Sequence, residues 1–169
     1  SIFTNALKAL LSFITGVILA RGLGVEEYGV FAFLMSSFTA SRLLLDMGTS
    51  SAFFTFISKF NRSKHFFRYY GAWLLFQFVI STFFILLVAP DSWVNSIWQG
   101  ENKIRVILAF MAVFLQQTIW IAITHIGESQ RLTLKVQKIN ISIAAFHLVA
   151  VVTMFMMDTL SIERVFIFV

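Results

Sequence analysis

The chain has 169 residues, of which 59% are apolar and only 12% are charged, with a mean hydropathy of +0.85 and a formal net charge of +5. Soluble domains carry about 25% charged residues, so this composition excludes a water-soluble globular protein and predicts a bilayer around most of the chain. Phe is frequent, Pro occurs once, and continuous apolar runs stand where a membrane β-barrel has alternating segments. We therefore expect an all-α, polytopic transmembrane helix bundle.

Five apolar runs are long enough to cross a membrane, for which about 20 residues are needed. In chain order they cover residues 2–20, 28–47, 70–89, 104–126 and 139–157, and the start of a sixth lies at Ile162. The connections are too short to hold a soluble domain. We expect residues 1–169 to form a single transmembrane domain. Because the sequence opens on Ser1 and stops inside an apolar run, we also expect it to be a fragment of a larger protein.

Lys and Arg are unevenly distributed between alternate connections. The connections after the second and fourth runs contain Lys59, Arg62, Lys64, Arg68, Arg131, Lys135 and Lys138, whereas the other connections contain Arg21, Lys103, Arg105 and Arg164. This excess predicts that the first set, and with it the N-terminus, is cytoplasmic. Tyr and Trp residues near the ends of the runs suit the two membrane–water interfaces in the same arrangement.

Two opposite charges lie in the cytoplasmic half of the second run. Arg42 and Asp46 are one helical turn apart on one face, close enough to pair. Either charge is costly next to lipid, so we expect both to face the bundle interior or a water-filled cavity. In one interpretation they edge a polar cavity in which Arg42 receives an anionic ligand. In the other, the pair neutralises itself and fixes helix packing.

The helix is expected to weaken directly after this pair. Gly48 has a low helix propensity, and the Ser and Thr residues that follow it compete for backbone hydrogen bonds. A break or hinge is therefore predicted there. Residues 52–59 resume as an amphipathic segment that we expect along the inner membrane surface.

Further polar side chains within the runs are candidates for the same cavity. Lys8 lies inside the first run, where a cation needs an anionic or aqueous environment, and Arg21 follows the end of that run. Single Gln or His residues in a bundle more often hydrogen-bond to a neighbouring helix than bind a ligand. The weaker candidates of this kind are Gln77, Gln116, Gln117 and His147.

Small residues recur at helical spacing on one face of each of the first two runs. The faces consist of Asn5, Ala9, Ser12, Gly16 and Ala20 in the first run, and of Gly29, Ala32, Ser36 and Thr39 in the second. Such faces are typical of close helix packing. The alternative is a substrate-lining role for their Ser and Thr side chains.

The connection between the first two runs carries a recognisable pattern. Gly22 and Gly24 favour a tight turn, and Glu26 and Glu27 suit the positive end of the next helix. The segments ILARGLGVEEYGVF (residues 18–31) and LLLDMGTSSA (residues 43–52) resemble the start of the bacterial polysaccharide and O-antigen flippases. These belong to the multidrug/oligosaccharidyl-lipid/polysaccharide exporter superfamily. Gly22 and Val25 depart from the Leu and Pro usual in that family.

The resemblance implies a carrier of about a dozen or more helices in two lobes, of which this chain is the N-terminal lobe without most of its sixth helix. Its implied cargo is a polyprenyl-diphosphate-linked oligosaccharide for surface polysaccharide biosynthesis. The carrier moves this lipid from the inner to the outer leaflet of the bacterial inner membrane by alternating access. The implied partners are the bilayer, this lipid and the missing C-terminal lobe, without nucleic acid. Arg42, Lys8 and Arg21 are the positions available for its phosphates.

Two alternatives stay open. A cation-coupled multidrug exporter of the same superfamily would use carboxylates in the first lobe, but Asp46 is the only acid within the five runs. A membrane enzyme would need more than His125 and Glu128, the best catalytic pair, which lacks a third ligand or base. We expect no enzyme activity, catalytic residue, metal or cofactor. A structural scaffold would not require Arg42 and Asp46 to be buried.

Overall fold

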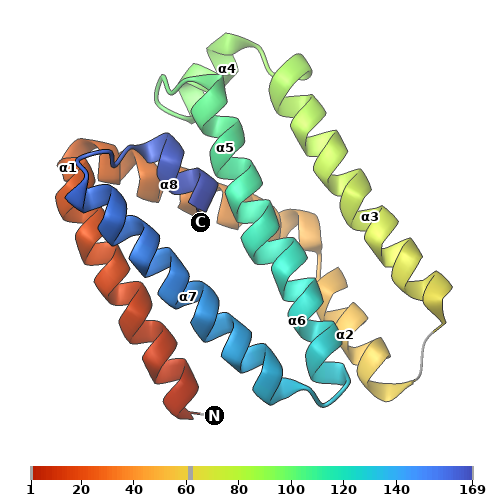
Figure 1. Ribbon diagram of the computed structural model, residues 1–169. Coiled ribbons are helices and arrows are strands. Elements are labelled where there is room, and N and C mark those ends of the chain that lie inside the picture. Colours follow the sequence, from red (N-terminus) through yellow and green to blue (C-terminus); the bar gives the residue numbers. More distant parts are fainter. Residues whose placement is uncertain (1, 61–62, 169) are drawn as a thin grey trace.

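The computed structural model describes residues 2–60 and 63–168, with the backbone alone for residues 2 and 3. These ranges are helical and contain no strand, which confirms the predicted all-α class (Figure 1). The α-helices are α1 (Ile2–Asp46), α2 (Thr49–Lys59), α3 (Lys64–Phe83), α4 (Asp91–Ile97), α5 (Lys103–Val113), α6 (Trp120–Ser129), α7 (Thr133–Met156) and α8 (Ile162–Phe168). Two π-helical stretches, η1 (Phe84–Val88) and η2 (Phe114–Ile119), continue α3 and join α5 to α6.

Four helical segments are long and apolar enough to cross a membrane: Thr4–Asp46, Lys64–Val88, Lys103–Ser129 and Thr133–Met156. The first has 43 residues, which is roughly 65 Å of helix and about twice the hydrocarbon thickness of a bilayer. It is bent at Gly24, where the backbone leaves helical geometry. Its two halves coincide with the first two predicted runs, so the described residues contain five segments of spanning length.

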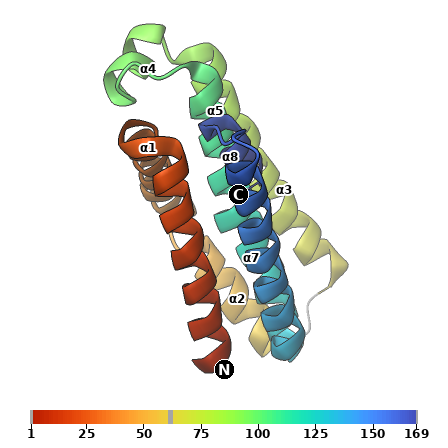
Figure 2. The same ribbon diagram turned by 60° about the vertical axis from the view of Figure 1, so that its left-hand side comes forward.

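Gly24 produces the bend between the two halves of α1. Its φ of 77° and ψ of 172° lie in a region that is essentially reserved for glycine. Figures 1 and 2 show the first half rising from the N-terminus and the second half leading back down to α2. Nearby, a Cβ on Gly22 would come within 2.5 Å of the Leu160 side chain and within 2.8 Å of Phe155. The two glycines of the predicted turn therefore have different tasks, backbone geometry and close packing.

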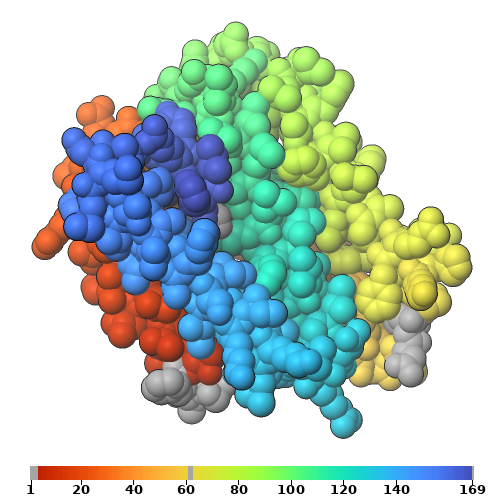
Figure 3. Space-filling view, in the orientation of Figure 1, coloured from red at the N-terminus to blue at the C-terminus, as the bar shows by residue number. Residues whose placement is uncertain are grey.

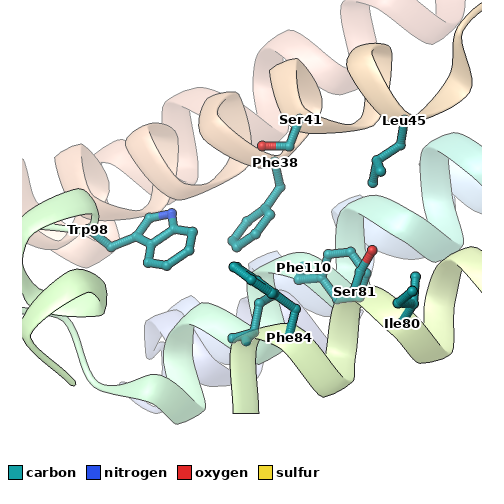
Figure 4. A pocket seen from close by; sticks show the side chains of 9 residues that line it. Phe38, Ser41, Leu45, Ile80, Ser81, Phe84, Trp98 and Phe110 are labelled. Atoms are coloured by element: carbon teal, nitrogen blue, oxygen red, sulfur yellow. The ribbon is translucent and has the colours of Figure 1, made fainter. Parts of the chain in front are cut away.

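The segment from α5 to α6 is the centre of the bundle. In its most apolar stretch 44% of the residues are buried, against 11% to 17% in the other spanning segments. Its Phe110 ring packs edge-on against Phe38 of α1 and stacks on Phe78 of α3. Trp98, after α4, is buried against Phe38 and donates its indole N–H to Ser37 Oγ at 3.2 Å. Packing against α1 thus gives Trp98 a structural role, and Figure 4 shows its ring facing that of Phe38.

A second, smaller core joins the first half of α1 to α7 and α8. Leu19 of α1, Val151 and Met154 of α7, and Val165 of α8 are buried together. Figure 3 shows α7 and the first half of α1 on one flank of the molecule, with α3 on the opposite flank. The bundle is therefore built from two packed groups that share α1.

The small-residue faces of α1 contribute little to the packing among the described residues. Asn5, Ala9 and Ser12 are exposed, and a Cβ added to Gly16 or Gly29 would meet nothing within 4 Å. Large side chains such as Leu19 and Leu34 make the helix contacts instead, because they bury more apolar area per residue. Within the described part of the chain these positions therefore add little to the packing, apart from Thr39, which accepts a hydrogen bond from Gln117. Close packing of the two faces against a further helix stays a prediction.

The bend predicts opposite effects for two glycine substitutions. Gly24→Ala forces a Cβ into glycine-only geometry and is expected to lower the free energy of unfolding by about 1–3 kcal/mol. Gly16→Ala, in regular helix with free space around it, is expected to raise it by up to about 1 kcal/mol. Thermal unfolding of both variants in detergent measures the difference. Equal melting temperatures would contradict the strained bend.

Candidate functional site

The break between α1 and α2 organises the polar side chains of the second spanning segment. Met47 and Gly48 have positive φ values of 44° and 80°, so the helix cannot continue through them. The Asp46 carboxylate then caps α2. Its Oδ1 accepts hydrogen bonds from the Ser50 amide at 3.0 Å, the Ser50 hydroxyl at 2.6 Å and the Thr49 hydroxyl at 2.9 Å. The predicted break is confirmed, and the hydrogen bonds of Asp46 to Thr49 and Ser50 stabilise the start of α2.

Arg42 does not pair with Asp46. The two side chains form no ion pair in the described residues, although Arg42 lies within electrostatic reach of the carboxylate. The Nε of Arg42 is buried and has no hydrogen-bond partner. The self-neutralising pair proposed from sequence is therefore corrected: Asp46 turns toward the start of α2, whose free N–H groups attract an anion, and Arg42 keeps an unused donor.

Two further helices bring polar atoms to the same place. The Tyr70 hydroxyl of α3 is buried beside the Ser50 side chain, and Arg42 and Asp46 both lie within its electrostatic reach. His125 of α6 is also within reach of Arg42 and Asp46, and its Nδ1 is buried and unpartnered. We call Arg42, Asp46, Ser50, Tyr70 and His125 the polar cluster. It gathers groups from α1, α2, α3 and α6.

The unpartnered atoms give the polar cluster its chemical capacity. Leaving a buried polar atom without a hydrogen bond costs about 1–3 kcal/mol, and such atoms are rare in folded proteins. Arg42 supplies a guanidinium donor, Tyr70 a hydroxyl that donates or accepts, and His125 a ring nitrogen that does either. Guanidinium groups suit phosphate and carboxylate oxygens. The cluster is therefore equipped for an anionic or hydroxyl-rich ligand.

Gln77 and Gln117 hold the second half of α1 in place. Gln77 is buried and donates its amide N–H to the Leu45 carbonyl at 3.0 Å, which is one of the carbonyls left free at the end of α1. Gln117 donates to Thr39 Oγ1 at 3.0 Å. Both glutamines therefore hydrogen-bond to a neighbouring helix, which was the alternative to lining the cavity.

The other predicted residues lie outside the polar cluster. Lys8 and Arg21 are exposed and form no ion pair among the described residues. Lys8 shares an open face of α1 with Asn5 and Ser12. Gln116 is exposed, and His147 of α7 has a buried, unpartnered Nε2. The structure therefore brings together Arg42 and Asp46 from this set, with Gln77 beside the end of α1.

The sequence did not predict Ser50 or Tyr70 as members of the polar cluster, and it did not place His125 beside Arg42. The sequence did contain a local signal for Ser50. An Asp that precedes a glycine and a Ser-rich helix start often caps that helix, and Ser50 lies four residues after Asp46, within reach of its carboxylate. Tyr70 and His125 carry no such signal. In the described part of the chain, no three His, Cys, Asp or Glu residues gather in a way that would hold a metal ion.

The opposite end of the bundle is tied by one arginine. Arg105 donates from Nε to Glu163 at 2.6 Å and from Nη1 to Glu27 at 3.2 Å and Glu101 at 3.3 Å. These contacts connect α5 to the bend of α1, to the end of the α4–α5 connection and to α8. From sequence, Glu27 was expected only to favour the start of a helix, and Arg105 was one of the positive charges in a connection. Their contact was not predicted.

The arrangement predicts unequal effects for two neighbouring cations. Arg105→Ala removes three carboxylate contacts and is expected to cost about 1–3 kcal/mol of unfolding free energy. Lys103→Gln removes one pair with Asp91, whose side chain is 81% exposed, and is expected to change stability by less than about 1 kcal/mol. Thermal unfolding in detergent distinguishes them. A larger loss for the Lys103 variant would refute this account of the Arg105 contacts.

The comparisons with known proteins give one match. A family model described as a polysaccharide biosynthesis protein matches residues 1–162, nearly the whole chain. No curated protein and no solved structure matches.

Proposed function

Because the chain belongs to the polysaccharide biosynthesis protein family, we propose that it translocates a lipid-linked oligosaccharide for surface polysaccharide biosynthesis. In this proposal a polyprenyl-diphosphate sugar moves from the inner to the outer leaflet of the bacterial inner membrane. The observation that carries the proposal is the buried, unpartnered Nε of Arg42 in a membrane-spanning segment. An intramembrane cation in this state is best explained by a ligand or an aqueous chamber.

The polar cluster supplies the head-group contacts in this proposal. Arg42 donates to a phosphate oxygen, and Tyr70 and His125 exchange hydrogen bonds with phosphate or sugar hydroxyls. The apolar outer surfaces of the helices leave the polyprenyl chain in lipid. Lys8, on the open face of α1, and Arg21, at its bend, add positive charge that attracts a diphosphate over distance.

The open faces of α1 support a second half of the carrier. In the proposal, Gly16 and Gly29 front a companion C-terminal lobe across an aqueous cavity, and the two lobes alternate in access. Small residues let such a lobe approach closely when the cavity closes. The Lys and Arg excess on the side of α2 supports an N-terminus in the cytoplasm.

One observation disfavours the drug-exporter alternative. A coupled exporter would use the Asp46 carboxylate to hold a proton or a sodium ion, but Asp46 Oδ1 already accepts three hydrogen bonds from Thr49 and Ser50. We propose that Asp46 positions α2 and that the protein acts as a transporter without a catalytic step.

Arg42→Gln tests the cationic site. Since Arg42 Nε makes no hydrogen bond inside the protein, the variant is expected to keep its expression and melting temperature. Export is expected to fall about tenfold or more, as for the loss of a charged hydrogen bond. The measurement is the amount of lipid-linked oligosaccharide that accumulates in cells. Lys138→Gln, an exposed lysine of α7, is the matched control. Normal export by the Arg42 variant would end the proposal.

Asp46 variants separate capping from ion coupling. Asp46→Asn keeps an acceptor oxygen for Ser50 and Thr49 and is expected to retain export within about threefold, whereas Asp46→Ala loses the cap at a cost of about 1–2 kcal/mol. Export and thermal unfolding are measured on both. Loss of transport in a stable Asp46→Asn variant, together with efflux of small organic cations that stops when ion gradients collapse, would favour the drug exporter.

A further inference from the structure

An aromatic groove runs between α2 and α3 on the side of the bundle where the two helices connect. It is an open depression of about 330 Å³. Its lining is almost entirely apolar and comes from both helices. The lining residues are Thr49, Ala52, Phe53 and Phe56 of α2 and Phe66, Tyr69, Tyr70 and Trp73 of α3. We call it the α2–α3 groove.

The floor of the groove is fixed by ring stacking. Phe53 is buried and stacks on Tyr70 with ring centroids 3.8 Å apart and on Phe66 at 5.8 Å. The rim, in contrast, leaves large rings uncovered: Trp73 is 42% exposed and Tyr69 is 76% exposed. Aromatic rings of this kind favour the boundary between hydrocarbon and head groups. The groove thus has a preformed floor and an open side suited to a hydrocarbon chain.

The charged residues between the end of α2 and the first turns of α3 all have the same sign. Between Asp46 and Asp91 the sequence contains no acidic residue, whereas Lys59, Arg62, Lys64 and Arg68 lie in this stretch. Lys59 follows Ala52 and Phe56 at helical spacing and therefore extends the face of α2 that lines the groove. Lys59 and Lys64 are exposed and form no ion pair within the described ranges. The end of the groove therefore presents cations that form no ion pair with a described carboxylate.

From this combination we propose that the α2–α3 groove binds an anionic phospholipid. One acyl chain lies along the aromatic floor, and the phosphate of the head group accepts hydrogen bonds from Lys59 at the end of α2. Clustered Lys and Arg residues beside a membrane segment attract anionic lipids, and the groove adds a fitted surface for the chain. This inference concerns a resident lipid and does not depend on the identity of the transported cargo.

The groove is linked to the polar cluster through two shared residues. Thr49 lines the groove and donates its hydroxyl to Asp46 at 2.9 Å. Tyr70 lines the groove with its ring, while its hydroxyl is buried near Ser50 and within electrostatic reach of Arg42. A lipid in the groove packs on α2 and α3 together. It therefore favours the arrangement in which α2 is docked and the polar cluster is assembled.

The test uses Trp73 as a reporter inside the groove. The protein is reconstituted in phosphatidylcholine nanodiscs that contain increasing fractions of phosphatidylglycerol with a dibrominated acyl chain, since bromine quenches indole fluorescence at contact. The contribution of Trp73 is the difference from Trp73→Phe. Half-quenching is expected at about fivefold less brominated phosphatidylglycerol than brominated phosphatidylcholine, as expected for one lysine contact.

Three variants identify the cause of the preference. Lys59→Gln is expected to remove it, and Lys138→Gln, which removes a lysine from the same side of the bundle, is expected to leave it unchanged. Ala52→Phe fills the groove at an exposed position and is expected to abolish selective quenching while the melting temperature stays unchanged.

Three results would overturn the proposal. The first is equal quenching by the two brominated lipids. The second is an equal effect of the Lys59 and Lys138 variants, which would indicate only general surface charge. The third is displacement of phosphatidylglycerol by an equimolar polyprenyl phosphate, which would assign the groove to the transported lipid. None of these results depends on whether Arg42 is required for export.

Discussion

In hydrocarbon every backbone N–H and C=O must find a partner inside the protein, and the break after Asp46 is where side chains meet this requirement. The Ser50 amide donates to Asp46, and the Leu45 carbonyl accepts from Gln77. Met47 and Gly48 end the helix, and these side chains satisfy backbone groups on either side of the break, so that α2 can take a new direction. The direction of α2 then brings Ser50 and the α3 contacts next to Arg42.

The polar cluster follows from this constraint. A straight continuation of α1 would leave Arg42 and Asp46 as neighbours on one face, where opposite charges one turn apart attract. The break occupies the carboxylate with α2, so Arg42 keeps an unused donor among Tyr70 and His125. A positive charge is thereby available in a membrane segment, which is the property that the proposed transport of a diphosphate lipid needs.

Different interactions stabilise the two ends of the bundle. At the end farther from α2, Arg105 joins three carboxylates from separate segments, and such multiple charged hydrogen bonds fix geometry. At the α2 end, stacked rings join α2 to α3. In our proposal, a lipid in the open groove beside these rings completes the contact.

The sequence by itself determined the spanning segments and the positions of the breaks at Gly24 and Gly48, because hydropathy and glycine geometry are local properties of the chain. It also placed Arg42 and Asp46 on one helix turn. Only the tertiary structure decided which face of α1 is covered, where the Asp46 carboxylate points, and that Trp98 is buried. These depend on side chains from α3, α4 and α6 that lie tens of residues away, such as Tyr70 and His125, and no local spacing encodes their approach.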